Sequence, residues 1–123
     1  MDISVYIIDC TRGSPAAGVP VSLERLTDGN WEKLARHRTD DNGLVVSPGF
    51  SSDRRGMHRI SIDIDSYFVG LGLEPFYPNI CITFRVSELA ESAHIPVLIA
   101  PYGFSSYSAI RRGPGMLAEL DRV

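Results

Sequence analysis

The chain has 123 residues and a formal net charge of −3, with 22% charged and 44% hydrophobic residues, which is the balance of one globular domain. Its basic residues are scattered, apart from the pairs Arg54-Arg55 and Arg111-Arg112, so the positive stripe that binds a nucleic-acid backbone is missing. No apolar run approaches a membrane span and no signal peptide opens the chain, so we expect a soluble, cytoplasmic protein that binds a small molecule and neither nucleic acid nor membrane.

Alternation of apolar and polar residues with a period of two dominates the first half of the chain and predicts β-strands. The turn signal Asp28-Gly29 separates two of these strands, and Asn42-Gly43 predicts a tight hairpin. A segment rich in Ser, Gly, Asp and Arg, residues 47–56, is expected to be a loop. The expected strands are 3–8, 19–24, 31–39 and 44–46.

The second half continues the alternation, interrupted by one short helix. Asp65-Ser66 can cap a helix through Leu71, which Gly72 would end. The expected strands are 58–64, 80–85, 95–100 and 104–110. Eight short strands with turn signals at this spacing are typical of an all-β, two-sheet sandwich. The domain is expected to span residues 1–110, followed by a C-terminal extension, 111–123, with an amphipathic pattern from Met116 onwards.

The two cysteines, Cys10 and Cys81, lie far apart and belong to neither a CxxC motif nor a Cys/His cluster. A zinc site is therefore not expected, and neither is any other metal or cofactor. Both residues are interpreted as buried free thiols in a reducing compartment.

Three predicted strands carry apolar residues on both faces, although the outer face of a sandwich strand is normally polar. Tyr6 and Ile8 lie opposite the core set of the first strand, and Pro96 and Leu98 lie opposite the core set of the seventh. Large exposed apolar patches are rare on soluble monomers. Subunit association is the economical explanation; a C-terminal segment folded back over this sheet is the alternative.

Several motifs resemble those of the transthyretin family, in the same order and spacing from about Ile3 to Ile110. The longest and most specific runs from His94 through Pro101-Tyr102-Gly103 to Tyr107. The others are Ile8-Asp9, Arg12-Gly13-Ser14-Pro15-Ala16, Asp41-Asn42-Gly43, Asp65-Ser66-Tyr67-Phe68 and Phe76-Tyr77-Pro78.

The resemblance implies a transthyretin-like sandwich of about eight strands with one short helix. It also implies a homotetramer, a dimer of dimers with ligand channels where the dimers meet. The family holds transthyretin, a carrier of hormones and of retinol-binding protein, and 5-hydroxyisourate hydrolases of urate breakdown. The hydrolases use two His, one Arg and a C-terminal Tyr-Arg-Gly-Ser.

Carried over position by position, only part of the hydrolase set is present. The second His falls on His94, whereas the first falls on Tyr6 and the Arg on Leu44. The terminal motif falls on residues 107–110, where only Tyr107 matches. A leucine cannot offer the planar donors of a guanidinium, and a phenol is a hydrogen-bond donor before it is a base. Arg111 or Arg112 are candidate replacements for the missing guanidinium.

The resulting site hypothesis gives His94 the role of general acid/base, with Tyr6 or Tyr107 as the orienting donor. The alternatives are a hydrogen-bonded interface histidine and aromatic interface residues. His37 and His58 are expected to lie outside the site, and His58 to be structural. The predicted substrate-binding residues are Ile8, Leu44, Pro96, Leu98, Ser105, Ser108 and Ala109.

These residues favour a divergent enzyme of the family that opens or closes the ring of a cyclic or aromatic nitrogen-containing molecule. One concrete version is an amine–aldehyde cyclisation of Pictet-Spengler type in natural-product biosynthesis. An atypical 5-hydroxyisourate hydrolase is the first alternative. A non-catalytic small-molecule carrier is the second.

Overall fold

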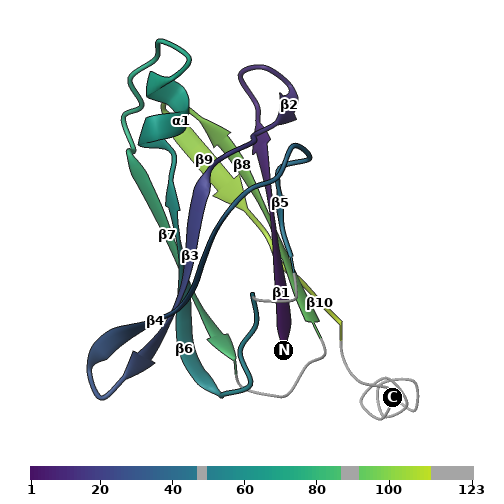
Figure 1. The fold of residues 1–123 in the computed structure, drawn as a ribbon, viewed down its shortest axis with the longest axis vertical. Helices are drawn as coiled ribbons and strands as arrows, with labels where there is room; N and C mark the ends of the chain where they lie inside the picture. Colours follow the sequence, from purple (N-terminus) through teal and green to yellow (C-terminus); the bar gives the residue numbers. More distant parts are fainter. Residues whose placement is uncertain (47–49, 87–91, 112–123) are drawn as a thin grey trace.

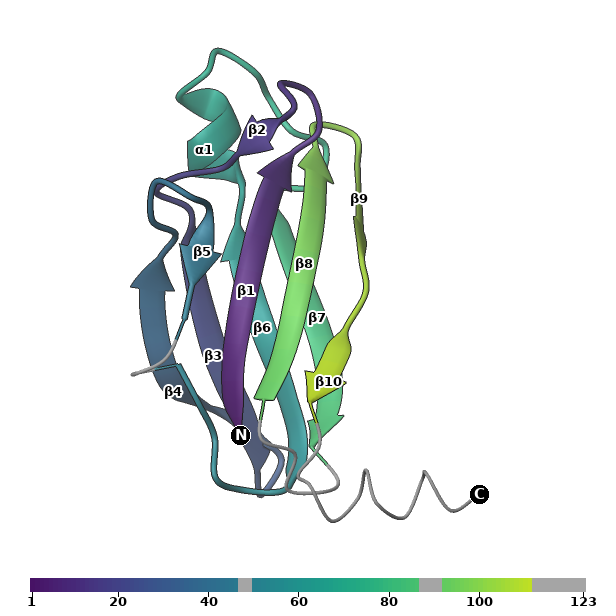
Figure 2. The same cartoon turned by 90° about the vertical axis from the view of Figure 1, so that its right-hand side faces the viewer.

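The computed structural model describes residues 1–46, 50–86 and 92–111, which form two β-sheets packed face to face (Figures 1 and 2). The predicted all-β, two-sheet sandwich with one short helix is confirmed. One sheet has the order β10-β8-β1-β2, with β5 added to β1 and β9 added to β8; the other has the order β4-β3-β6-β7. The first sheet contains β1 (Asp2–Asp9), β2 (Ser14–Pro15), β5 (Leu44–Val45), β8 (Ser92–Ala100), β9 (Gly103–Ser106) and β10 (Ala109–Arg111). The second contains β3 (Pro20–Thr27), β4 (Asn30–Arg38), β6 (Gly56–Asp63) and β7 (Asn79–Val86).

The alternation seen in the sequence becomes the division between core and outer face. Along β1, buried residues at every second position alternate with half-buried ones, and β6 repeats this pattern. Most core side chains are Ile and Val, and Phe50 and Phe68 are among the largest fully buried members. Burial of this apolar surface is the main favourable term for the fold.

The buried carboxylate of Asp9 joins the end of β1 to the helix. One carboxylate oxygen accepts the backbone N–H of Thr11 at 2.9 Å, and the other accepts the hydroxyl of Tyr67 at 2.8 Å. Burial raises the pKa of the Tyr67 hydroxyl, and the hydrogen bond to Asp9 adds to this. The phenol therefore stays protonated and keeps donating to Asp9.

The helix α1 (Asp65–Val69) is shorter than predicted. It ends at Gly70, two residues before the expected Gly72. No side chain caps it at Ile64; instead, Asp63 accepts the backbone N–H of Asp65 at 3.1 Å. The predicted Asp65-Ser66 cap is therefore wrong, because the carboxylate that satisfies the first turn is that of Asp63, two residues before the helix begins.

Three further expectations need correction. The sheets contain ten strands among the described residues, since the two-residue β2 was missed and the last predicted strand is two strands, β9 and β10. Cys10 and Cys81 are free but exposed, not buried. Cys10 follows the end of β1, and Cys81 pairs with Ser61 on the solvent face of the second sheet, so neither reaches the core. The amphipathic tail, residues 116–123, lies outside the described residues.

Candidate functional site

The central feature of the site is the parallel pairing of β1 with β8 (Figure 2). Ser4 is paired with His94, and Tyr6 with Pro96. Because side chains alternate along a strand, these four residues share one face of the sheet, opposite the core set. On the same sheet, Leu44 of β5 is paired with Tyr6 on the other side of β1. Residues far apart in the chain are thereby gathered on one outer face.

An open depression of about 280 Å³ lies on this face, lined by Tyr6, Leu44, His94, Pro15 and Asn42. Three of these are predicted site residues, so the structure brings the matched family positions together. Most of the lining is apolar; Asn42, His94 and the Tyr6 hydroxyl provide polar groups.

The rim of the depression near Asn42 is fixed by a tight turn. Asp40 accepts the backbone N–H groups of Asn42 at 2.9 Å and of Leu44 at 3.0 Å. Gly43 lies between them with a φ of 77°, and a Cβ there would come within 2.6 Å of the carbonyl oxygen of Ile7. Only glycine allows this turn to approach β1 so closely, and the approach places Leu44 beside Tyr6.

The His94 ring is oriented by a side chain that the sequence interpretation missed. The hydroxyl oxygen of Ser4 lies 2.6 Å from Nδ1 of His94. No other hydrogen bond to this ring is formed within the described residues, so Nε2 remains available to a ligand. A fixed ring with one free nitrogen is the arrangement that proton transfer requires.

Pro96 explains why the last predicted strand is split. A proline has no N–H to donate to a neighbouring strand, and pairing of β8 with its neighbour stops between Ser106 and Ala109. The Ser106 hydroxyl donates to the Pro96 carbonyl at 2.7 Å on one side of the gap. Tyr107 lies in the gap with its side chain 65% exposed, outside the residues that line the depression.

The remaining predicted binding residues are not among those that line the depression. Ile8 and Leu98 are paired on the same face and are half-buried. Ser105 and Ala109 lie on β9 and β10 and are exposed, and Ser108 lies in the gap between these strands. Of the candidate replacement arginines, Arg111 is exposed on β10, and Arg112 lies outside the described residues.

No group of three or more His, Cys, Asp or Glu side chains that could hold a metal occurs within residues 1–46, 50–86 and 92–111. In the same ranges, no helix is long and apolar enough to cross a membrane. The described lining itself offers hydrogen-bonding groups and one imidazole that can exchange a proton.

Three members of the site went unpredicted: Ser4, Pro15 and Asn42. Alternation alone places Ser4 on the face of Tyr6, and that signal was available. Its pairing with His94 follows from the parallel register of two strands about 90 residues apart, which no local pattern encodes.

Comparison with known proteins identifies relatives along nearly the whole chain. The HIUase/Transthyretin family matches residues 3–109. A 5-hydroxyisourate hydrolase of Salmonella dublin is 35% identical over 107 residues, covering 85% of this chain and 78% of its own. A 5-hydroxyisourate hydrolase of Caulobacter vibrioides is 34% identical over 109 residues, covering 85% of this chain and 95% of its own.

Solved structures agree with this. The structure of Klebsiella pneumoniae 5-hydroxyisourate hydrolase is similar with a TM-score of 0.76 at 32% identity, covering 89% of this chain and 99% of that one. Transthyretin from Sparus aurata shares the fold with a TM-score of 0.81 at 22% identity, covering 88% and 96% of the two chains. The chain therefore belongs to the HIUase/Transthyretin family.

Proposed function

We propose that this protein is a hydrolase-type enzyme in which His94 acts as general acid/base to open the ring of a cyclic, nitrogen-containing molecule less polar than 5-hydroxyisourate. The observation that carries the proposal is the oriented His94 ring, held by Ser4 at 2.6 Å and lining an open depression. The names of the relatives favour water as the second reactant. Nothing among the described residues favours ring closure of the Pictet-Spengler type over ring opening.

The His94 ring can act both as the base that takes a proton from water and as the acid that protonates the leaving group in a hydrolysis. An imidazolium, formed when Nε2 takes a proton while Nδ1–H donates to the Ser4 hydroxyl, can return that proton from Nε2 to a leaving nitrogen. When Nδ1–H donates to Ser4, Nε2 is an acceptor and can take a proton from water. Tyr6, on the same lining, provides a hydroxyl that can donate to a developing oxyanion.

Tyr107 and the half-buried Ile8 and Leu98 are assigned to the site through association. Tyr107 is exposed, and Ile8 and Leu98 are half-buried apolar residues on an outer face, so we propose that a homotetramer covers this face and converts the open depression into a channel. In that assembly Tyr107 would approach the ligand from the rim.

The absence of a guanidinium from the described lining argues for a less polar substrate than that of the relatives. Leu44 stands beside Tyr6 where the resemblance implies Arg, and it can make only apolar contacts. Freshly generated 5-hydroxyisourate should therefore be hydrolysed poorly. The double variant Leu44→Arg, Tyr6→His should raise that rate, and activity of the parent equal to that of a family hydrolase would contradict the proposal.

A small-molecule carrier is the second candidate, because the depression is mainly apolar and the described lining holds a single imidazole. His94→Asn separates the two. We expect it to lower turnover of a panel of cyclic ureides, imides and lactams by roughly a hundredfold to ten-thousandfold, with binding changed only a few-fold. His37→Asn, on β4 of the other sheet, is the matched control. Ligand binding without turnover, weakened by His94→Asn, would instead establish the carrier.

A further inference from the structure

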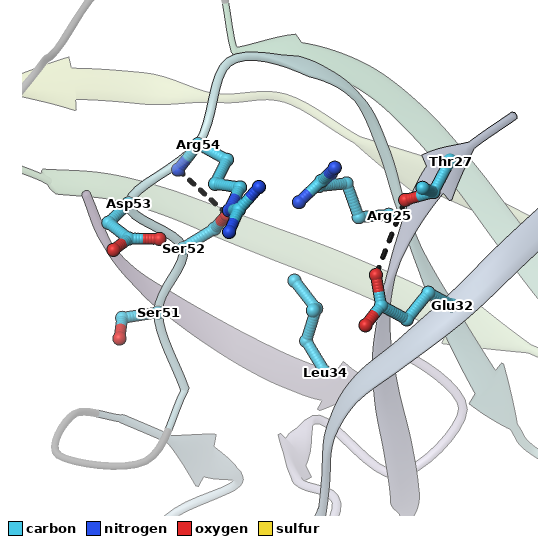
Figure 3. Close-up of a pocket in the computed structure, with 8 residues that line it drawn as sticks. All are labelled: Arg25, Thr27, Glu32, Leu34, Ser51, Ser52, Asp53 and Arg54. Carbon is cyan, nitrogen blue, oxygen red and sulfur yellow. Dashed lines mark hydrogen bonds between the residues drawn. The ribbon is translucent and has the colours of Figure 1, made fainter.

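A second cavity, of about 530 Å³, is lined by residues of β3 and β4 and by the segment 51–54 (Figure 3). It shares no lining residue with the depression around Tyr6 and His94. Its size is within the range of small-molecule sites. The lining residues are Arg25, Thr27, Glu32, Leu34, Ser51, Ser52, Asp53 and Arg54.

A shift in the pairing of β3 with β4 shapes one wall of this cavity. The pairing of β3 with β4 shifts between Leu23 and Glu24, so that Leu34 has no partner and Glu32 is paired with Arg25. Such a bulge turns side chains away from the plain alternation. Leu34 consequently lies on the cavity floor beneath Arg25 (Figure 3).

The opposite wall is a firmly held loop segment. Ser52 is buried: its Oγ lies 2.7 Å from Nε2 of His58, and its backbone exchanges hydrogen bonds with Met1. The Arg54 backbone N–H donates to the Ser52 hydroxyl at 3.4 Å. The segment carrying Arg54 is thus tied to the core before any ligand arrives, which reduces the entropy that binding would cost.

Two guanidinium groups face one another across the cavity. The side chains of Arg25 and Arg54 point toward each other from opposite walls (Figure 3), and neither forms an ion pair within the described residues. Two like charges held in this way repel, and a bound anion would relieve that repulsion. Arg is also the side chain best suited to oxyanions, because its donors form a planar fork.

The neighbouring carboxylates limit the positive potential without occupying the space between the arginines. The Glu32 carboxylate accepts the Thr27 hydroxyl at 3.3 Å and is turned to that side of the cavity (Figure 3). Asp53 lies on the far side of Arg54 (Figure 3). Both carboxylates would repel an anion bound between the guanidinium groups.

We propose that this cavity is a phosphate-binding site for a small phosphorylated metabolite. A dianion matches two guanidinium groups in charge. Its tetrahedral oxygens can be approached from two directions at once, whereas a carboxylate offers its two oxygens in one plane. The Ser51 hydroxyl is a further donor on the lining. The space beyond the phosphate, floored by Leu34, accommodates the organic part.

The test is an NMR titration of the ¹⁵N-labelled protein with inorganic phosphate and with ribose 5-phosphate, at constant ionic strength set with chloride. We expect saturable shifts confined to residues 25–34 and 51–54. Tighter binding of ribose 5-phosphate would identify a phosphorylated metabolite as the ligand, and equal binding would identify free phosphate. Absence of saturable shifts with both probes would overturn the proposal.

Charge variants sharpen the test. Arg25→Gln and Arg54→Gln should each weaken binding roughly fivefold to tenfold, a charge-assisted hydrogen bond reduced by solvent screening. Arg55→Gln is the matched control, because Arg55 is the next residue and does not line the cavity. Glu32→Gln should act in the opposite direction and tighten binding. If Arg55→Gln weakens binding as much as Arg54→Gln, or if Glu32→Gln does not tighten it, the site is refuted.

Discussion

Two serine–histidine pairs lie in this small domain, and they serve different ends. In the first sheet, Ser4 Oγ lies 2.6 Å from Nδ1 of His94. At the end of the second sheet, Ser52 Oγ lies 2.7 Å from Nε2 of His58. The contact is nearly the same in both pairs, so the difference must come from what surrounds the ring.

Both nitrogens of the His58 ring have hydrogen-bond partners inside the protein. It is 0% exposed, its Nδ1–H donates to the Gly56 carbonyl at 3.0 Å, and its face stacks on Phe84. Because Nδ1 carries the proton, Nε2 must accept from the Ser52 hydroxyl in the neutral ring. Burial lowers the pKa of His58, and the hydrogen bond to Gly56 opposes this with a smaller effect. The ring is locked in one neutral tautomer.

The His94 ring is half-buried and lines the depression, and the described residues provide a hydrogen-bond partner for Nδ1 alone. A Ser–His contact therefore does not by itself indicate catalysis. The criterion is whether the second nitrogen already has a partner inside the protein.

The largest expected effect concerns the locked pair. His58→Leu removes both hydrogen bonds and leaves the Ser52 hydroxyl without its acceptor, which should lower the free energy of unfolding by about 3 kcal/mol. His94→Leu should change it by less than about 1 kcal/mol, since this ring is partly exposed. Urea unfolding followed by tryptophan fluorescence measures both. Equal losses in the two variants would remove the distinction between the pairs.

The second largest expected effect is a loss of folding stability in acid, caused by protonation of His58. The pKa of His58 is lowered in the folded protein, so the unfolded chain binds the proton first as the pH falls below 6.5. Stability from this group is therefore complete above that pH and is lost as the pH falls through the folded-state pKa. The slope cannot exceed about 1.4 kcal/mol per pH unit for one proton. His58→Leu should flatten this part of the stability curve; an unchanged curve would assign the acid sensitivity elsewhere.

The smallest effect concerns Ser4 as a positioning residue. Ser4→Ala should lower kcat roughly threefold to tenfold, the loss of one hydrogen bond, with KM nearly unchanged. It should also move the pH profile of kcat, because Nδ1 loses its partner, and Ser4→Thr should restore both. A lower kcat with an unmoved pH profile would show that Ser4 only supports packing.

Much of the fold was predictable, because alternation along β1, β6 and β8 directly encodes which side chains face the core. Local patterns failed where the deciding contact is remote. Nothing near Ser106 or Ala109 marks the break between β9 and β10, since its cause is Pro96 on the neighbouring strand. The prediction that Cys10 and Cys81 are buried is wrong, because their exposure depends on their positions after β1 and on the outer face of β7, and not on the residue type.

The site was predictable in part for the same reason. Tyr6, Leu44 and His94 were found through the resemblance, which already contains the tertiary arrangement of the family. Ser4 was missed because its role depends on the register between β1 and β8 in this chain. The cavity around Arg25 and Arg54 was not predicted at all, since it arises from a bulge and a loop that meet only in three dimensions.

The parallel ladder between β1 and β8 also has a consequence for synthesis. It joins residues 2–9 to residues 92–99, so β1 leaves the ribosome about 90 residues before the strand with which it pairs. Pairing of such high sequence separation is slow to form, and until then the edge of β1 is open to other chains. The hairpins of the second sheet, formed from neighbouring segments, can assemble while translation continues. A nascent chain released before β8 emerges would therefore lack His94 and the pairing that brings this residue beside Ser4.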